Sequence, residues 1–249
     1  MEDNNIDQSS GIREMTFLEH LEELRWTLVR AFIGIVLGAI LCWVFIDLII
    51  DEILLRPARI NNLKLQNLRP FGQLFLYIQV ALIGGFIISL PNVVYQIWKF
   101  IEPALKRGEK KYVSLIVIFT SLCFLSGVAF AYFLMLPYAL NFAGAFGSAN
   151  ITNFFSIEEY FSIIVSVMLL AGIVFELPML SFFLTKLGIL TPKFMRRYRR
   201  HSIVVIFILA ALLTPTTDPV SQLILAVPLL FLYELSIYIS KLSQRKSSD

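Results

Sequence analysis

The chain has 249 residues, of which 57% are hydrophobic and only 16% are charged, whereas soluble domains average roughly 45–50% apolar and about 25% charged residues. Its net charge of +3 is too small to indicate nucleic-acid binding. No charged residue occurs in the 46 positions from Tyr112 to Ile157, and about 18 apolar residues in a row already indicate a membrane span. The composition therefore predicts an all-α membrane protein and excludes a disordered chain, a coiled coil and a disulfide scaffold.

Six apolar stretches follow a polar N-terminal tail, residues 1–16. They are predicted to form six transmembrane helices, at residues 31–50, 71–98, 112–136, 160–185, 202–213 and 221–239. Pro91 predicts a kink in the second helix because its ring removes a hydrogen bond. Pro137 is expected to close the third helix, and the glycines of the connector that follows are expected to break any helix there. Residues 51–70 are predicted to be a polar loop.

The last two apolar stretches are separated by a turn that contains Pro215 and Pro219. The stretch at residues 202–213 reaches only ~18 Å at 1.5 Å per residue, against a hydrocarbon core of ~30 Å. We therefore expect the last two helices to be short, so that their hairpin stops below the far surface or the bilayer thins around it. All six helices, with an amphipathic segment before the first, make one membrane domain at residues 17–242, and a polar C-terminal tail spans residues 243–249.

The basic residues predict the orientation of the chain, because lysine and arginine concentrate on the cytoplasmic side of membrane proteins. Seventeen of the 21 basic residues lie before the first span, in the second and fourth connections, or after the last span. The other four share the first external loop: Arg56, Arg59, Lys64 and Arg69. Both termini are therefore predicted to be cytoplasmic in a multi-pass protein of the cytoplasmic (inner) membrane.

The segment before the first span predicts an amphipathic helix. Thr16 and Glu19 stand in the register of a capping box, which marks a helix start. One face of this helix is apolar, and the opposite face carries Glu19, Glu22 and Glu23. One interpretation is an interfacial helix that leads into the membrane. Such helices usually present basic residues to anionic lipid, whereas these carboxylates equally suit the other interpretation, a site for a basic ligand.

Glu176 is the carboxylate predicted to lie deepest in the membrane. It precedes Lys186 by ten residues, or ~15 Å of helix, which places it near the midplane of the bilayer. A charge at that depth is costly unless it is protonated or paired, so Glu176 is a functional candidate. The structural alternative is a neutral glutamic acid that bonds to polar groups of a neighbouring helix. In the first predicted span, at residues 31–50, the motif Gly34-x-x-x-Gly38 predicts close contact between helices.

Signatures of catalysis or metal binding are absent from the sequence. It has no HExxH motif, no glycine-rich phosphate loop and no Cys/His spacing typical of zinc sites. Cys42 and Cys123 lie inside apolar runs and are expected to be small buried residues. Glu109, within a basic connection, is by itself typical of a solvated loop with a neutralising ion pair. We expect no enzyme activity, no cofactor and no metal site.

An ordered set of motifs resembles one family, TatC, the core membrane component of the twin-arginine (Sec-independent) protein translocase, from about Thr16 to Leu242. The motifs are the segment from Glu19 to Arg25, Pro91 with the segment from Tyr95 to Leu105, the segment from Phe130 to Phe133, the segment from Phe175 to Pro178, Leu213-Thr214-Pro215 with the segment from Asp218 to Gln222, and Pro228 with Leu232-Tyr233-Glu234. Each is weak alone, but six in order on the predicted topology are specific.

The resemblance implies a receptor that binds twin-arginine signal peptides of folded cargo at the cytoplasmic face. It implies assembly with single-span TatA- and TatB-type subunits, self-assembly in the translocase, and transport driven by the proton-motive force. The positions that match the family's signal-binding residues are Glu23, Arg25, Phe100 and Glu109. Glu176 matches an intramembrane contact position, and Pro57, Tyr132 and Asp218 match further functional positions.

The chain departs from the family pattern at three positions. Thr27 stands where a second basic residue is usual, Glu102 where a small residue is common, and Lys106 where an aromatic residue is common. These changes bear on signal affinity. The alternative function is a small proton-coupled secondary transporter with Glu176 as the proton relay, although the chain has no internal repeat of the kind such transporters use.

Overall fold

The computed structural model describes residues 17–101, 113–145, 153–186, 188–213 and 219–245. Almost all of them are helical. The helices are α1 (Phe17–Val44), α2 (Ile46–Leu48), α3 (Arg56–Ile60), α4 (Gly72–Ile101), α5 (Val113–Phe130), α6 (Leu136–Ala145), α7 (Ile157–Phe175), α8 (Leu177–Lys186), α9 (Pro192–Arg197), α10 (Arg199–Leu213) and α11 (Pro219–Arg245), with two π-helical segments, η1 (Ile49–Leu54) and η4 (Ala131–Met135). Two strands, β1 (Lys64–Gln66) and β2 (Phe154–Ser156), complete the fold.

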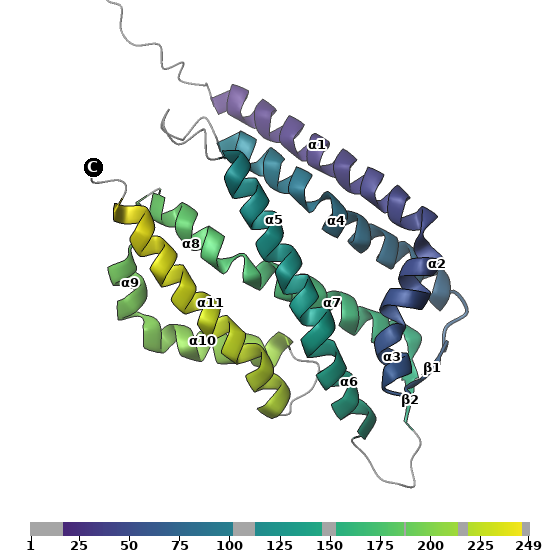
Figure 1. Ribbon diagram of the computed structural model, residues 1–249. Coiled ribbons are helices and arrows are strands. Elements are labelled where there is room, and N and C mark those ends of the chain that lie inside the picture. The colour runs from purple at the N-terminus through teal and green to yellow at the C-terminus, as the bar shows by residue number, and fades with distance from the viewer. Residues whose placement is uncertain (1–16, 102–112, 146–152, 187, 214–218, 246–249) are drawn as a thin grey trace, which may run out of the picture.

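The long helices lie obliquely side by side, with α1 along α4, α5 across α7, and α11 along α8 (Figure 1). Glycines allow α1 and α4 to approach closely, because a Cβ added to Gly38 would lie 2.6 Å from the backbone oxygen of Gly85. The same holds for α5 and α7, where a Cβ on Gly127 would lie 2.6 Å from the backbone oxygen of Ala171. The close helix contact that the sequence predicted from Gly34-x-x-x-Gly38 is therefore confirmed, with Gly85 as its partner.

Five helical stretches of the described residues are long and apolar enough to cross a membrane. They are Leu18–Val44, Gly72–Ile101, Ile116–Ala145, Ile157–Lys186 and Gln222–Leu242. The chain is thus a multi-pass helical membrane protein. The prediction that the last two helices are short is not confirmed, because α10 has 15 residues but α11 has 27. Helix α11 begins at Pro219, inside the predicted turn, and continues beyond the apolar stretch into Lys241 and Arg245.

Two predicted helix boundaries differ from the structure. The first helix begins at Phe17 and not at Ala31, because the amphipathic segment and the first span form one continuous helix, α1, that ends at Val44. Pro137 does not close the third helix, which continues through α6 to Ala145. The π-helical segment η4 ends at Met135, two residues before Pro137. The N–H of Leu136, which follows η4, donates a hydrogen bond to the Ala131 oxygen five residues back. The wider turn gives room to the proline ring, although Pro91 and Pro228 lie within the α-helices α4 and α11.

The segment predicted as a polar loop at residues 51–70 is largely structured. It contains most of η1, all of α3 and strand β1. Strand β1 pairs in parallel with β2, so that Lys64, Leu65 and Gln66 lie opposite Phe154, Phe155 and Ser156. We call η1, α3, β1 and β2 the cap, which lies at the opposite end of the molecule from the first residues of α1 (Figure 1).

Candidate functional site

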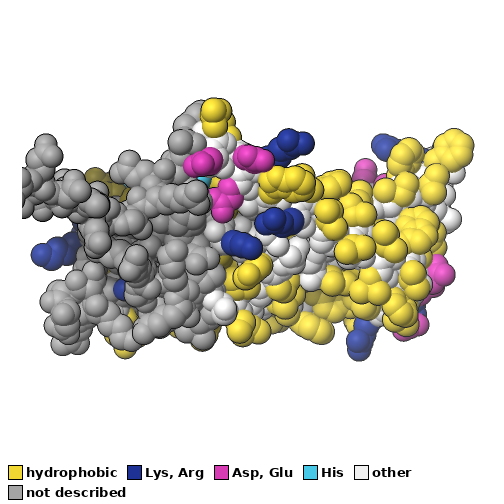
Figure 2. Space-filling model, turned by 90° about the horizontal axis from the view of Figure 1, so that it is seen from above, with side chains coloured by type: hydrophobic (Ala, Val, Ile, Leu, Met, Phe, Trp, Pro, Cys, Tyr) yellow, Lys and Arg dark blue, Asp and Glu magenta, His cyan; other side chains and the backbone are white. Residues whose placement is uncertain are grey.

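The end of the molecule where α1 begins carries the acidic face that the sequence predicted. Acidic side chains gather there with basic ones beside them, whereas hydrophobic side chains predominate toward the other end of the described surface, which carries further charged side chains at its edge (Figure 2). On α1, Glu22 is exposed and Glu23 is half-buried. The Oε2 atom of Glu23 is enclosed by protein and has no hydrogen-bond partner within the described part of the chain. Because an enclosed carboxylate oxygen is costly without a donor, Glu23 is suited to receive one from a ligand.

An aromatic stack brings Phe100 to the same end of the molecule. The rings of His20 in α1 and Phe100 in α4 are stacked, with centroids 4.4 Å apart and an angle of 21° between their planes. Glu23 follows His20 by three positions and therefore shares its helix face. Arg25 is exposed on α1, so the structure places three of the four predicted signal-binding residues at one end. The fourth, Glu109, lies outside the described residues, as do Thr16, Glu102 and Lys106.

Glu176 lies at the break between α7 and α8. Its backbone (φ −75°, ψ −11°) ends α7, and Pro178 at the second position of α8 supplies no N–H to the ladder. The side chain is half-buried and interacts electrostatically with Cys123 and with the backbone of Phe124 in α5. Its Oε1 atom is enclosed and unpartnered among the described residues. This carboxyl is therefore available for a further polar contact inside the membrane-spanning part of the fold.

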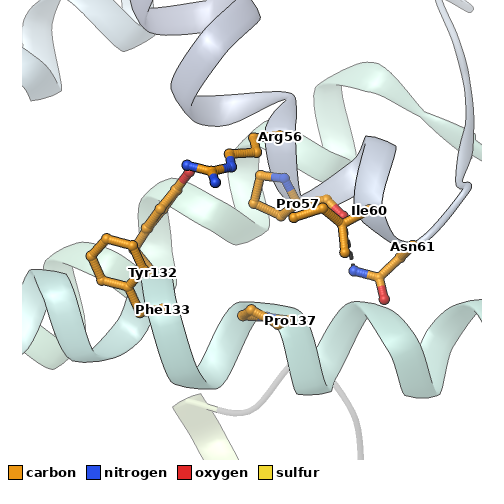
Figure 3. Close-up of a pocket in the computed structure, with 7 residues that line it drawn as sticks. All are labelled: Arg56, Pro57, Ile60, Asn61, Tyr132, Phe133 and Pro137. Atoms are coloured by element: carbon orange, nitrogen blue, oxygen red, sulfur yellow. Dashed lines mark hydrogen bonds between the residues drawn. The ribbon is translucent and has the colours of Figure 1, made fainter.

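Pro57 and Tyr132 meet at the cap, at the other end of the fold. With Arg56, Ile60, Asn61, Phe133 and Pro137 they line a cavity of about 190 Å³ (Figure 3). The Arg56 guanidinium points toward the Tyr132 hydroxyl, which donates a hydrogen bond of 2.8 Å to the Ile53 oxygen. Pro57 is buried, and its oxygen accepts a hydrogen bond of 2.8 Å from the Asn61 amide. Asp218, the third residue of this predicted group, lies outside the described residues.

Tyr160 of α7 is a structural residue that holds the cap and that the sequence did not reveal. Its buried hydroxyl donates to the Leu54 oxygen (2.7 Å) and accepts from the Ala58 N–H (3.1 Å). These partners lie more than 100 positions earlier in the chain, so no local pattern could have revealed them. His20 was missed as the partner of Phe100 for a similar reason, although its position within the acidic segment was a usable signal.

A comparison with known families decides what this arrangement belongs to. The family described as "Sec-independent protein translocase protein (TatC)" matches residues 19–228. The chain belongs to the TatC family. It is therefore a core membrane subunit of the Sec-independent translocase and not an enzyme, which confirms the prediction from the ordered motifs.

Relatives and solved structures agree with this assignment. The TatC protein of Aquifex aeolicus is 36% identical over 239 residues, which cover 94% of this chain and 98% of the relative. The TatC protein of Carboxydothermus hydrogenoformans is 36% identical over 234 residues, which cover 94% and 96%. A crystal structure described as the twin arginine translocase receptor TatC superposes with a TM-score of 0.77 at 36% identity, covering 91% of this chain and 100% of that one. A second, in the detergent DDM, gives a TM-score of 0.78.

Proposed function

We propose that this chain is the receptor of its translocase and binds twin-arginine signal peptides of folded cargo through the carboxylates of Glu23 and Glu109. The observation that carries the proposal is the enclosed, unpartnered Oε2 atom of Glu23. A guanidinium offers paired N–H donors in a fork that fits a carboxylate, so two carboxylates suit two successive arginines. The description of the similar crystal structure as a receptor supports the same function for this chain.

The stack between His20 and Phe100 supports the inclusion of Glu109. It holds the end of α4 beside the face that carries Glu23. Glu109 follows Phe100 by nine positions. An extended chain of nine residues reaches at most about 30 Å, so Glu109 lies within about 30 Å of Phe100. The connection after α4 can therefore bring a second carboxylate to the first. Arg25 and Phe100 complete the proposed surface, because both match signal-binding positions of the family, and Phe100 offers an apolar face to the signal peptide.

The basic residues support an orientation in which this surface faces the cytoplasm, as do both termini. In this orientation α10 is a short fifth membrane segment between the spans of α8 and α11. Glu176 then serves an intramembrane polar contact with a partner helix or with the inserted signal, and not with the arginines. The partners are TatA- and TatB-type single-span subunits and further copies of this chain, and transport uses the proton-motive force. The names of the relatives support a translocase and not the alternative, a secondary transporter.

A binding experiment tests the proposed carboxylate pair. Full-length protein in lipid nanodiscs is titrated with a fluorescent twin-arginine signal peptide. Because charge-assisted hydrogen bonds contribute about 1.5–3 kcal/mol each, we expect Glu23→Gln or Glu109→Gln to weaken binding roughly tenfold or more. The double variant should lose less than the two effects combined, since both groups hold one ligand.

Glu22→Gln is the matched control, because Glu22 is exposed on the same helix turn and its loss removes the same charge. It should change binding by less than about twofold, as surface charges contribute little. A signal peptide with both arginines replaced by lysine should bind wild-type protein more weakly, because lysine lacks the fork. Unchanged binding by the Glu23→Gln, Glu109→Gln double variant would overturn the proposal.

A further inference from the structure

A second cavity, distinct from the surfaces described above, lies where α4 and α7 begin. It has a volume of about 240 Å³. Its polar lining comes from Arg69, Gln79, Glu158 and Ser162, and its apolar lining from Phe75, Leu76 and Phe161. Both helices are membrane spans in the described part of the chain. The cavity therefore lies at the level of the membrane surface, where lipid headgroups are found.

Glu158 carries the unsatisfied group of this cavity. One of its carboxylate oxygens, Oε2, accepts a hydrogen bond from the Ser156 hydroxyl. The other, Oε1, lies against Gly72 and makes no hydrogen bond of regular geometry to the residues that the structure describes, while the backbone N–H groups of Glu158 and Arg69 stabilise the carboxylate as a whole. The backbone of Gly72 leaves room for this oxygen, because a Cβ on Gly72 would collide with it. An enclosed carboxylate oxygen without a donor favours a ligand that brings an N–H group.

Arg69 supplies the opposite charge at the same cavity. Its side chain is exposed, and its positive charge acts on the Glu158 carboxylate. The cavity thus offers an acceptor for an ammonium group beside a cation for a phosphate. One small molecule with both groups in adjacent positions would satisfy both residues, whereas an anion or a cation alone would satisfy one and be repelled by the other.

The surroundings of the cavity are those of a lipid site. At the start of α4, Phe75 and the preceding Phe71 are each 68% exposed, and Leu74 and Ile78 are also exposed. Phe75 also lines the cavity, so an apolar surface leads directly away from the charged groups. A water-soluble ligand would gain nothing from this surface, but the acyl chains of a phospholipid would lie along it.

We propose that this cavity binds the headgroup of phosphatidylethanolamine, with the ammonium group on Glu158 and the phosphate near Arg69. A primary ammonium donates hydrogen bonds to the Oε1 atom of Glu158, which the trimethylammonium of phosphatidylcholine cannot do. Phosphatidylglycerol has no cation for Glu158. The site is therefore selective for the amine of the headgroup, while Arg69 binds the phosphate that all three lipids share.

Native mass spectrometry of the full-length protein, released from detergent, tests this selectivity. Delipidated protein is titrated with phosphatidylethanolamine, phosphatidylcholine or phosphatidylglycerol of matched acyl chains. We expect phosphatidylethanolamine to bind about tenfold more tightly than phosphatidylcholine, as one charge-assisted hydrogen bond predicts. Glu158→Gln should remove this preference, and Arg69→Gln should weaken the binding of phosphatidylethanolamine and of phosphatidylcholine by the same factor. Equal binding of the two lipids by wild-type protein would overturn the proposal.

Two further variants separate a site from a general effect of charge or folding. Glu159→Gln removes the neighbouring exposed carboxylate and should keep the preference for phosphatidylethanolamine. If this variant lost the preference, a specific role for Glu158 would be contradicted. Ser162→Phe fills the cavity while it leaves Glu158 in place, and should abolish selective binding in protein whose thermal unfolding is unchanged. Soluble phosphoethanolamine should compete poorly, and competition as strong as that of the lipid would replace the lipid site with one for a free metabolite.

Discussion

The two ends of the molecule are held together in different ways. At the cap, Tyr160 and Tyr132 both bond to backbone oxygens of η1 and β1 pairs with β2, while the Oε1 atom of Glu158, beside β2, stays unmatched within the described residues. At the end that carries Glu23, a ring stack joins the two helices, and a carboxylate oxygen also remains unmatched within the described residues. Satisfied polar groups make an end rigid, and unsatisfied ones make it ready for a ligand. The difference separates an end that is held by buried hydrogen bonds and borders the proposed lipid site from an end that is held by a ring stack and carries the proposed signal site.

Substitution of Glu176, which lies between the two ends, is expected to have the largest effect, on cargo transport. Glu176→Ala should abolish cargo transport, because it removes the carboxyl group that makes the proposed polar contact. Glu176→Gln keeps the shape and can still bond, so it should retain transport if bonding alone matters and fail if the charge is needed. Transport of a twin-arginine reporter by cells measures both variants. Wild-type transport by Glu176→Ala would contradict the proposed role.

The cap predicts the next largest effect, on stability. Tyr160→Phe removes a hydroxyl that serves a buried N–H and a carbonyl, and each unsatisfied group costs about 1–3 kcal/mol. We expect the free energy of unfolding in detergent to fall by about 2–3 kcal/mol, with signal-peptide affinity unchanged. Tyr132→Phe is the control, since its hydroxyl makes one bond outside the buried core, and should cost less. A loss of signal affinity in Tyr160→Phe would show that the two ends are coupled.

The end that carries Glu23 predicts the smallest effect on stability. His20→Ala removes the stack on Phe100, and aromatic pairs contribute about 0.5–1.5 kcal/mol. The expected result is a small fall in the midpoint of thermal unfolding together with a several-fold loss of signal affinity, because the end of α4 is released from α1. His20→Phe keeps a ring and should restore both values. Identical signal affinity in His20→Ala and wild-type protein would remove the stack from the proposed site.

The fold followed from the sequence where hydrophobic length is decisive. The apolar runs located all five long spans, and the distribution of basic residues together with the family resemblance predicted that Glu23 and Phe100 lie at one end, because membrane thickness and charge placement constrain a helical protein strongly. The sequence did not predict that the third helix continues through Pro137, because a π-helical turn is set by backbone hydrogen bonds that no residue pattern indicates. The cap did not follow either, because Tyr160 and its partners are distant in sequence.

The pairing of β1 with β2 has a consequence for the order in which the chain assembles. Lys64 and Phe154 are 90 positions apart, so β1 waits roughly 5–18 s for its partner at synthesis rates of about 5–20 residues per second. By then α1, α4 and α5 have all been made, and only α7 must follow to carry Tyr160 into place. The strand pair of the cap therefore forms late in synthesis, after α1, α4 and α5 have been made. It can form only when the ends of these helices bring β1 and β2 side by side.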